Sequence, residues 1–444
     1  MSRSTSSSVS CWRRDLALCL ALVITSALLA ACGSSGSSGG TSGGGQTLTI
    51  WSSGAPAQNG EGFIYPVIKD FEAAHPGVKV QIVAKPPDNY FAMLKNAMIG
   101  YTGPDIAQVY AGTYSSDLIP FFLNLNAYVP ASTRNSLAGV QYYAENSNPS
   151  LDTFALPYEE QFYNMWYNKA LFAKAGIKAP PTDFSQMATD CRLLTEKGIS
   201  PLADGNPTFV TPGMGAIQDW SYLAAAPYSL KQWNQILDGG IPYNSPALIA
   251  EVNEWANMFK AGCATKSILT ENANQKFMSG KAAMVMNFNG LYSTYAPSLK
   301  SNLGIMIPPW SPTPQHNLIE LPGAGYAVVK TSPNAKLAAE FVAFTVSRRA
   351  QEYAAADGQL PVISSVPAQG PPSQLIAMAN SGKYHLYPMF DNYMPQDVIA
   401  QIDYQLPQAF VGSQSASGAL GAMEAAYKSS LPASQQHPNF NLGG

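Results

Sequence analysis

The sequence has 444 residues, of which 46% are hydrophobic and 12% are charged, and its formal net charge at pH 7 is −3. A chain of this length and apolar content can bury a large core, and its length favours two lobes over one. The negative charge argues against nucleic acid as a partner, because binding to phosphates needs a surplus of Lys and Arg.

The first 32 residues predict export. Arg13 and Arg14 precede an apolar run over 16–31, and small residues stand directly before Cys32. The run is too short to span a bilayer comfortably, and this order is typical of a lipoprotein signal peptide, residues 1–31, cleaved before a lipid-modified cysteine. The alternative is an uncleaved membrane anchor. Either way, the remaining chain is expected outside the cytoplasm, in the periplasm or on the outer face of the cell.

After Cys32 the chain consists of Gly, Ser and Thr up to residue 45. These residues offer no apolar surface to bury, so residues 32–45 are predicted to form a flexible tether. Removal of the signal peptide leaves 22 basic and 27 acidic residues, a formal charge of −5. The mature chain is therefore more acidic than the precursor.

Strands and helices alternate at the start of the mature chain. Strands are expected over 46–51, 78–83 and 105–110, where β-branched and apolar residues run or alternate. Helices are expected over 63–74 and 90–99, where apolar residues recur at helical spacing. This order predicts an α/β fold with a mostly parallel sheet flanked by helices. Its ligand crevice would lie beyond the carboxyl ends of the strands.

Two of the five cysteines leave with the signal peptide and Cys32 takes the lipid, so Cys191 and Cys263 remain. In an oxidising compartment this pair is compatible with one disulfide or with two separately buried thiols. The four histidines are scattered along the chain and form no cluster with cysteine. We therefore expect no metal site and no cofactor.

Several short motifs follow one another along the chain. They are LTIW at 48–51, FEAAHPGVKV at 71–80, GPDI at 103–106, LPY at 156–158, WYNKALF at 166–172, FMSGKAAM at 277–284, GAGYAV at 323–328, AAEFV at 338–342 and GQLP at 358–361. Each motif is weak alone. In this order and spacing, the chain resembles the extracellular solute-binding proteins of carbohydrate ABC importers, the family that includes maltose-binding protein. The resemblance covers residues 48–431.

The resemblance implies a two-lobed periplasmic-binding-protein fold of type II, with a sheet and flanking helices in each lobe and a hinge that the chain crosses more than once. The extended, Pro-restricted segments at 156–157 and 307–309 agree with such crossings. The predicted division gives residues 46–157 and 304–350 to the first lobe, and residues 158–303 and 351–444 to the second.

A sugar site needs acidic and amide side chains beside flat aromatic platforms. The loops after the first and third strands place Trp51, Ser53, Tyr110 and Thr113 at the predicted crevice. For Trp51 and Tyr110 the alternative is core packing. Asp105 follows a proline and is expected to serve a turn or a cap, not the ligand.

The first crossing begins with Tyr158, Glu159 and Glu160. Because adjacent strand residues point to opposite faces, Glu159 and Glu160 cannot flank one glycosidic bond as a hydrolase pair. Tyr158 and Glu160 share a face, and Glu160 is the best acidic candidate for ligand contact. The alternative for Glu160 is a solvated rim carboxylate.

The resemblance implies further contacts in the second half of the chain, including a stacking aromatic at the position of Trp220. Where the family usually has a Trp soon after a Gly, this chain has Leu291 and Tyr292, which leaves Phe288 and Tyr292 as alternatives. Core packing is the alternative for Trp220 and Trp310, and an ordinary turn for the glycine-rich segment. The further candidates are Trp220, Asn287, Asn289, Tyr292, Trp310, Gly325, Tyr326 and Gln359.

Arginine is scarce in the mature chain, which contains only Arg134, Arg192, Arg348 and Arg349. None of these lies in a predicted strand-end loop. Because carboxylate and phosphate ligands are most often held by bidentate arginine, the sequence favours a neutral ligand.

Together these features predict a lipid-anchored, monomeric substrate-binding protein that captures a neutral sugar or oligosaccharide between two closing lobes. It would deliver the sugar to a separate ABC permease and perform no chemistry. One alternative is a secreted glycoside hydrolase, for which no convincing pair of opposed carboxylates is found. Another is a binding protein for a glycerophosphodiester or a peptide.

Overall fold

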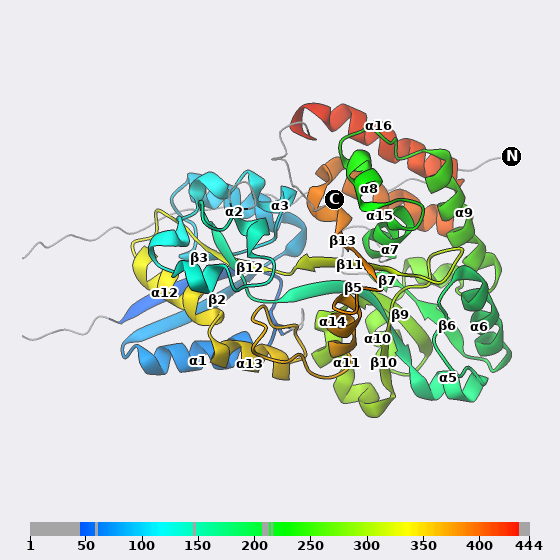
Figure 1. Cartoon of the computed structure of the whole chain (residues 1–444), viewed down its shortest axis with the longest axis horizontal. Coiled ribbons are helices and arrows are strands. Elements are labelled where there is room, and N and C mark those ends of the chain that lie inside the picture. The colour runs from blue at the N-terminus through cyan, green and yellow to red at the C-terminus, as the bar shows by residue number, and fades with distance from the viewer. Residues whose placement is uncertain (1–44, 58–60, 145–147, 207–212, 215, 435–444) are drawn as a thin grey trace, which may run out of the picture. The chain divides into compact units, whose positions relative to one another are not determined.

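The structure of the chain, a computed structural model, describes residues 45–57, 61–144, 148–206, 213–214 and 216–434. Two β-sheets, each flanked by helices, organise this part of the chain (Figure 1). The predicted signal peptide, the lipid site at Cys32 and nearly all of the predicted tether lie outside the described residues.

The first sheet contains, in spatial order, β2 (Val78–Lys85), β1 (Gln46–Ser53), β3 (Ile106–Val109), β12 (Gly325–Val328) and β4 (Ala155–Pro157). β1 pairs in parallel with β2 and β3. β12 runs antiparallel to both β3 and β4. A strand from late in the sequence therefore completes a sheet that the first 160 residues begin.

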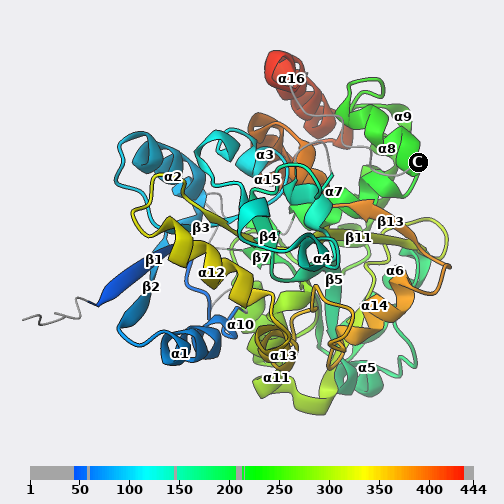
Figure 2. The same ribbon diagram turned by 60° about the vertical axis from the view of Figure 1, so that its left-hand side comes forward.

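Helices cover both faces of the first sheet, and alternating side chains of β3 serve the two faces. Ile106 packs into the cluster that contains Ile64 and Phe71, whereas Ala107 packs with Tyr90 and Leu94. The helix α12 packs against β12 and also contacts α1 and α13, which are labelled with it in Figure 2. The helices of the first cluster are α1 (Ile64–Ala74), α12 (Ala335–Thr345) and α13 (Arg348–Ala356), and the other face carries α2 (Tyr90–Ile99).

The second sheet contains, in spatial order, β13 (His385–Pro388), β11 (Asn317–Pro322), β5 (Glu160–Asn168), β9 (Ala282–Phe288) and β6 (Ser200–Ala203). β10 (Leu303–Met306) pairs with the far half of β5. The β11–β13 and β6–β9 pairs are parallel, and β5 is antiparallel to all its neighbours. β7 (Gly205–Asn206) and β8 (Gly213–Met214) form a separate two-stranded sheet.

Most of the helices lie in the lobe of the second sheet. Among them, α15 packs against α16, α7 and α9 (Figure 1). They are α5 (Lys169–Ala175), α6 (Phe184–Glu196), α7 (Ala216–Ala225), α8 (Leu230–Leu237), α9 (Pro246–Lys260), α10 (Ala273–Met278), α11 (Tyr292–Leu299), α14 (Ser373–Ala379), α15 (Gln396–Phe410) and α16 (Ala416–Ser434). Short helices elsewhere are α3 (Thr113–Ser116), α4 (Ala131–Arg134), η1 (Pro87–Asn89), η2 (Ile119–Phe121), η3 (Leu125–Ala127), η4 (Val140–Tyr143), η6 (Lys266–Leu269), η7 (Asn289–Leu291), η8 (Lys300–Asn302) and η9 (Phe390–Tyr393).

The predicted α/β fold with two helix-flanked sheets is confirmed, with two corrections. The sheets are mixed, not mostly parallel, because β12 and β5 run against their neighbours. The predicted return to the first lobe at residue 304 is also wrong. β10 and β11 both pair with β5, so the chain returns to the first sheet at 322–325. α13 then extends the first lobe beyond residue 350, since it packs against α1.

The two sheets are joined by strands that cross side by side. The Tyr158 N–H donates to the Ala324 carbonyl over 3.1 Å, and the Gly323 N–H donates to the Glu159 carbonyl over 2.8 Å. A third segment joins them, because the Glu160 N–H donates to the Leu360 carbonyl over 2.9 Å. We call residues 158–160 and 323–325 the crossing.

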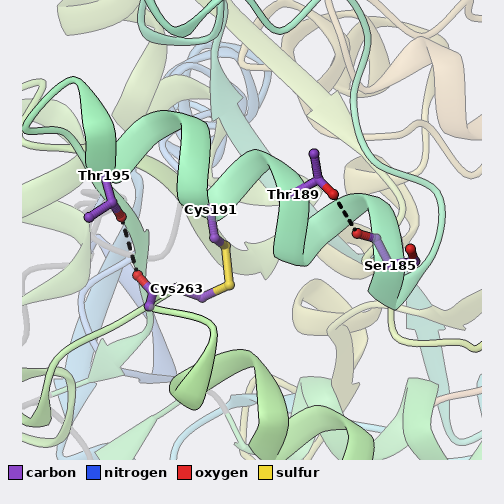
Figure 3. Close-up of a disulfide and its surroundings, with 6 residues drawn as sticks. Ser185, Thr189, Cys191, Thr195 and Cys263 are labelled. Atoms are coloured by element: carbon purple, nitrogen blue, oxygen red, sulfur yellow. Dashed lines mark hydrogen bonds between the residues drawn. A yellow bond between two sulfur atoms is a disulfide. The ribbon is translucent and has the colours of Figure 1, made fainter.

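A disulfide joins Cys191 on α6 to Cys263 after α9, with 4.9 Å between the two Cα atoms (Figure 3). Both cysteines are fully buried. The Cys263 carbonyl accepts a hydrogen bond from the Leu202 N–H of β6, so the disulfide joins two helical segments beside the β6 edge of the second sheet. Of the two alternatives for this pair, the structure contains the disulfide.

Loss of this disulfide should destabilise the second lobe. The bond spans 72 residues, and on the chain-entropy model a loop of that size contributes about 4 kcal/mol. The Cys191→Ser, Cys263→Ser double variant is expected to lose most of that free energy of unfolding in urea titrations. Wild-type protein titrated with reductant serves as the control and should match the variant. Two free thiols in denatured, unreduced wild-type protein would contradict the bond.

Candidate functional site

Gln108 lies at the centre of a buried hydrogen-bond network at the carboxyl end of β3. Its side-chain oxygen accepts from the Ser53 N–H over 2.7 Å. Its amide nitrogen lies 2.8 Å from Glu61 Oε1 and 2.6 Å from the Tyr158 hydroxyl. The Tyr158 hydroxyl in turn donates to Glu61 over 2.9 Å. The network therefore ties the end of β1, the end of β3 and the crossing together.

Glu61 supplies the carboxyl group of that network and is 3% exposed. Burial raises its pKa to about 7, against the opposing effect of the hydrogen bonds from Tyr158 and Gln108. Within the described residues, its donors are the Tyr158 hydroxyl and the Gln108 amide, both uncharged. Glu61 therefore joins Gln108 to Tyr158 through hydrogen bonds.

Tyr110 follows β3 and remains partly exposed at the strand ends. The Ser53 side chain hydrogen-bonds to it, and burial together with the charges of Glu61 and Glu159 raises its pKa, so it stays protonated. Trp51 is also partly exposed, but the Lys85 ammonium lies 3.9 Å from the centre of its ring. Ser53 and Tyr110 therefore contact each other at the strand ends, whereas one face of Trp51 carries the Lys85 ammonium. Ligand contact by these three residues stays a prediction.

Glu159 is the fully buried acid of the crossing. Its Oε1 accepts from the Gln161 side-chain amide over 2.8 Å, and its Oε2 has no partner within the described residues. Burial and then the charge of Glu61 raise its pKa well above the usual range. A Cβ on Gly323 would lie 2.5 Å from Glu159 Cγ, so only glycine leaves room for this carboxyl.

Glu160, the predicted acidic contact, points to the other face of β5. It is partly exposed, and burial followed by the charge of Glu320 on β11 raises its pKa to about 8. Burial raises the pKa of Glu320 to about 7. Glu159 and Glu160 therefore lie on opposite faces, as the strand geometry requires.

Four aromatic residues predicted at the ligand are core residues, and one of them is Tyr158, which is fully buried and donates its hydroxyl to Glu61. Trp220 is fully buried, with its ring 6.0 Å from Tyr243 and 5.9 Å from Phe390, so its prediction as a stacking platform is wrong. Trp310 is also fully buried and donates its N–H to Asp219 over 2.6 Å. Tyr326 is 1% exposed and packs on Tyr158 at 4.7 Å. Hydrophobic burial, not ligand contact, accounts for these rings.

Two predicted polar contacts serve the protein interior instead. Asn289 is fully buried, and its side-chain oxygen accepts from the Phe162 N–H over 2.7 Å. Gln359 is fully buried, and its amide lies 3.5 Å from the Gly290 carbonyl. The prediction that these two amides face the ligand is therefore wrong, because they hold the start of β5 and the loop after β9.

Three further residues predicted at the ligand are Asn287, Tyr292 and Gly325. The first two are partly exposed, and the third is a glycine at a close backbone contact. Asn287 is partly exposed and donates to Asn274 over 3.2 Å. Tyr292 is partly exposed, and a Cβ on Gly358 would lie 2.0 Å from its ring. Gly325 fits the expected close approach, since a Cβ there would lie 2.8 Å from the Leu156 carbonyl. Asn287 and Tyr292 stay predictions as ligand contacts.

None of the four arginines of the described chain takes part in these contacts. Arg134 is 4% exposed and donates to the backbone carbonyls of Asn126, Val129 and Pro149. The other three form surface ion pairs, Arg192 with Glu196, Arg348 with Glu352 and Arg349 with Asp70. Hydroxyl, amide and carboxyl groups therefore dominate the strand ends, which suits an uncharged, hydroxyl-bearing molecule.

Within the described residues, no group of three or more His, Cys, Asp or Glu side chains is arranged to hold a metal ion. In the same part of the chain, no helix has the length and apolar content that a membrane crossing requires.

The family described as bacterial extracellular solute-binding protein matches residues 54–352. The chain belongs to this family. Its members are extracellular binding proteins by description, which agrees with the resemblance drawn from the motifs and with an extracytoplasmic location.

A curated relative from Brucella abortus (strain 2308), named as a binding protein, is 26% identical over 257 residues. The match spans 56% of this chain and 59% of the relative, so the chain covers less than two thirds of that protein's length.

Solved structures share the fold at low identity. A chitin oligosaccharide binding protein has a TM-score of 0.74 at 18% identity, over 87% of this chain and 99% of its own. A protein described in work on xylan utilization by Caldanaerobius polysaccharolyticus has a TM-score of 0.72 at 19% identity, over 85% and 99%. The GacH receptor of Streptomyces glaucescens, solved alone and with acarbose, has a TM-score of 0.70 at 20% identity, over 87% and 98%. These structures establish the two-lobed fold.

Sequence reasoning missed Glu61, Gln108 and Gln161. A signal for Gln108 was available, because an amide inside the otherwise apolar segment 106–109 must find buried partners. Glu61 carries no such signal, since it stands in a segment rich in Gly and Ala. Gln161 stands directly after Glu160, and an acidic side chain is the stronger candidate of the two for a sugar contact.

Ionisation of Glu61 should make the fold less stable as pH rises. In the unfolded chain the carboxyl loses its proton near pH 4.5 and in the folded protein near pH 7, so the folded state holds the extra proton in between and stability falls with rising pH. Glu61→Gln should reduce the loss of unfolding free energy between pH 5 and pH 8 by about 2 kcal/mol. Urea titrations at both pH values measure this.

The exposed Glu196→Gln variant is the control and should keep the wild-type pH dependence. Other buried carboxyls leave some slope in every variant, so the comparison is between slopes. Equal slopes for wild type and Glu61→Gln would show that Glu61 is ionised alike in both states.

Proposed function

We propose that this protein is a lipid-anchored substrate-binding protein of an ABC importer that binds a neutral sugar or oligosaccharide between its two lobes. It would act as a monomer, attached to the membrane through Cys32, and present its closed form to a separate permease. The observation that carries the proposal is the site at the strand ends. There Tyr110 is partly exposed and lies beside Ser53, which is 7% exposed, over a buried network of amide and hydroxyl groups without an arginine.

The comparisons support a carbohydrate ligand. Relatives of the same fold are named for chitin oligosaccharide, or were solved with acarbose. An aromatic ring beside hydrogen-bonding groups of both kinds is the chemistry that a sugar requires, since its ring face is apolar and its hydroxyls both donate and accept.

The hydrolase alternative is poorly supported by the geometry. A glycosidase needs two carboxyl groups on either side of the scissile bond. Glu61 and Glu159 are within electrostatic reach of each other, but they are 3% and 0% exposed, so neither meets a glycosidic oxygen. The phosphodiester alternative lacks an arginine partner, because every arginine of the described chain is engaged elsewhere. The basic group near the strand ends is the Lys85 ammonium, which lies against the Trp51 ring.

A thermal-shift screen of the purified chain is expected to give a higher melting temperature with one group of related sugars, because a ligand that binds only the folded state stabilises it. The panel contains mono-, di- and oligosaccharides, peptides and glycerophosphodiesters. Tyr110→Ala should weaken binding of the active sugar about tenfold through loss of ring contact. Titration calorimetry gives the dissociation constants.

Tyr101→Ala is the matched control, because Tyr101 is 81% exposed in the same lobe. It should bind like wild type. A shift with peptides or glycerophosphodiesters alone would overturn the sugar, and steady release of products from a glycan would overturn the binding protein.

Lipid attachment is tested separately at Cys32. Mass spectrometry of the mature amino terminus should find a diacylglyceryl modification on this cysteine, and Cys32→Ser should abolish it and release the protein from the membrane fraction. Cys19→Ser, within the predicted signal peptide, should leave both unchanged. An unmodified terminus on membrane-bound wild-type protein would favour the uncleaved anchor instead.

A further inference from the structure

The loop after β3 touches the second lobe at η9. The Asn392 side chain donates to the Ala111 carbonyl over 2.8 Å, and Thr113 Oγ1 donates to the Asn392 carbonyl over 3.3 Å. The Tyr114 hydroxyl donates to Asp391 over 3.2 Å. Residues 111–114 belong to the first lobe, so three hydrogen bonds cross between the lobes at this place. We call it the η9 contact.

Gly112 determines how closely the two segments approach. Its φ is +75°, and a Cβ on it would lie 1.8 Å from the Asn392 carbonyl oxygen. Any other residue would push η9 away from the loop. The contact therefore depends on glycine at this position for two reasons, its backbone conformation and its lack of a side chain.

Asp391 is anchored within its own lobe as well. It is 6% exposed, and its other oxygen accepts from the Tyr163 hydroxyl of β5 over 3.0 Å. The carboxyl thus receives one phenol from each lobe. The Met389 N–H, just before η9, donates to the Glu320 carbonyl of β11 over 3.1 Å, so η9 stays on the second sheet without the Tyr163 bond. The bond to Tyr114 therefore holds the first-lobe loop to that sheet.

Tyr114, which is held by Asp391, packs against Tyr110. Their rings lie 6.0 Å apart in an edge-to-face arrangement, and Phe91 packs against both, at 5.4 Å from Tyr114 and 5.8 Å from Tyr110. The Ser115 hydroxyl also donates to the Tyr110 carbonyl. The ring that faces the predicted ligand is therefore held, through Tyr114, by a carboxylate of the other lobe.

We propose that Asp391 and Asn392 are positioning residues of the ligand site, which hold the 111–114 loop from across the lobes and thereby place Tyr110. They do not touch the ligand; they set the geometry of the residue that does. This inference deepens the proposed function and rests on it for the role of Tyr110, but the η9 contact itself can be tested without any ligand.

Hydrogen–deuterium exchange of the ligand-free full chain provides the test. Tyr114→Phe removes one bond between the lobes and should speed exchange of amides 111–118 about tenfold. Tyr163→Phe is the matched control, because it removes a phenol from the same carboxylate but within one lobe. It should change exchange near β5 and leave 111–118 at the wild-type rate.

Gly112→Ala should speed exchange over the same amides at least as much. Gly77→Ala is its control, since Gly77 has a φ of +90° with nothing within 4 Å of its missing Cβ. That control separates backbone strain from the collision with Asn392. Unchanged exchange at 111–118 in Tyr114→Phe, or equal effects of Tyr114→Phe and Tyr163→Phe, would overturn the proposal.

The second measurement is a dissociation constant. It is measured for Tyr114→Phe with the compound of the thermal-shift panel that raises the melting temperature of the wild-type protein. It should rise about tenfold, while Tyr163→Phe stays within a factor of two. If exchange responds as expected but only a peptide binds, the sugar is wrong and the positioning role stands. If a sugar binds and exchange does not respond, the positioning role is wrong and the sugar stands.

Discussion

The close approach of two backbone segments at the crossing is the constraint on which the rest of the structure depends. The Tyr158 N–H donates to the Ala324 carbonyl, and the Gly323 N–H donates to the Glu159 carbonyl. Because Gly323 has no side chain, it leaves room for the Glu159 carboxyl. Because the strands on either side feed different sheets, these bonds fix where one sheet ends and the other begins. They also deliver Tyr158 to the network around Gln108.

The candidate site follows from that arrangement. Gln108, at the end of β3, hydrogen-bonds to Tyr158 and Glu61. The position of the crossing therefore determines where the buried network lies beneath the strand ends. The loop that follows β3 then extends to the other lobe and meets η9. A movement of one lobe relative to the other would therefore change the position of Tyr110, which lies between the Gln108 network and the η9 contact.

The sequence predicted elements that depend on local pattern and missed those that depend on distant partners. Strands and helices over residues 46–110 were expected within a few residues, because periodicity and turn residues define them. The placement of β11 in the second sheet was not, because nothing local in 317–322 says which strand it pairs with. The predictions for Trp220 and Trp310 as ligand contacts were wrong for a related reason. The sequence around an aromatic residue does not show whether its ring packs in a core or lines a crevice.

The disulfide has a consequence for the order of folding. Both of its cysteines lie between the first crossing and β9, so the bond encloses only second-lobe residues and ties nothing across the lobes. Its closure therefore does not require β11, η9 or the carboxyl-terminal helices to be in place. The second lobe can thus acquire a covalent cross-link before the strand that returns to the first lobe has docked.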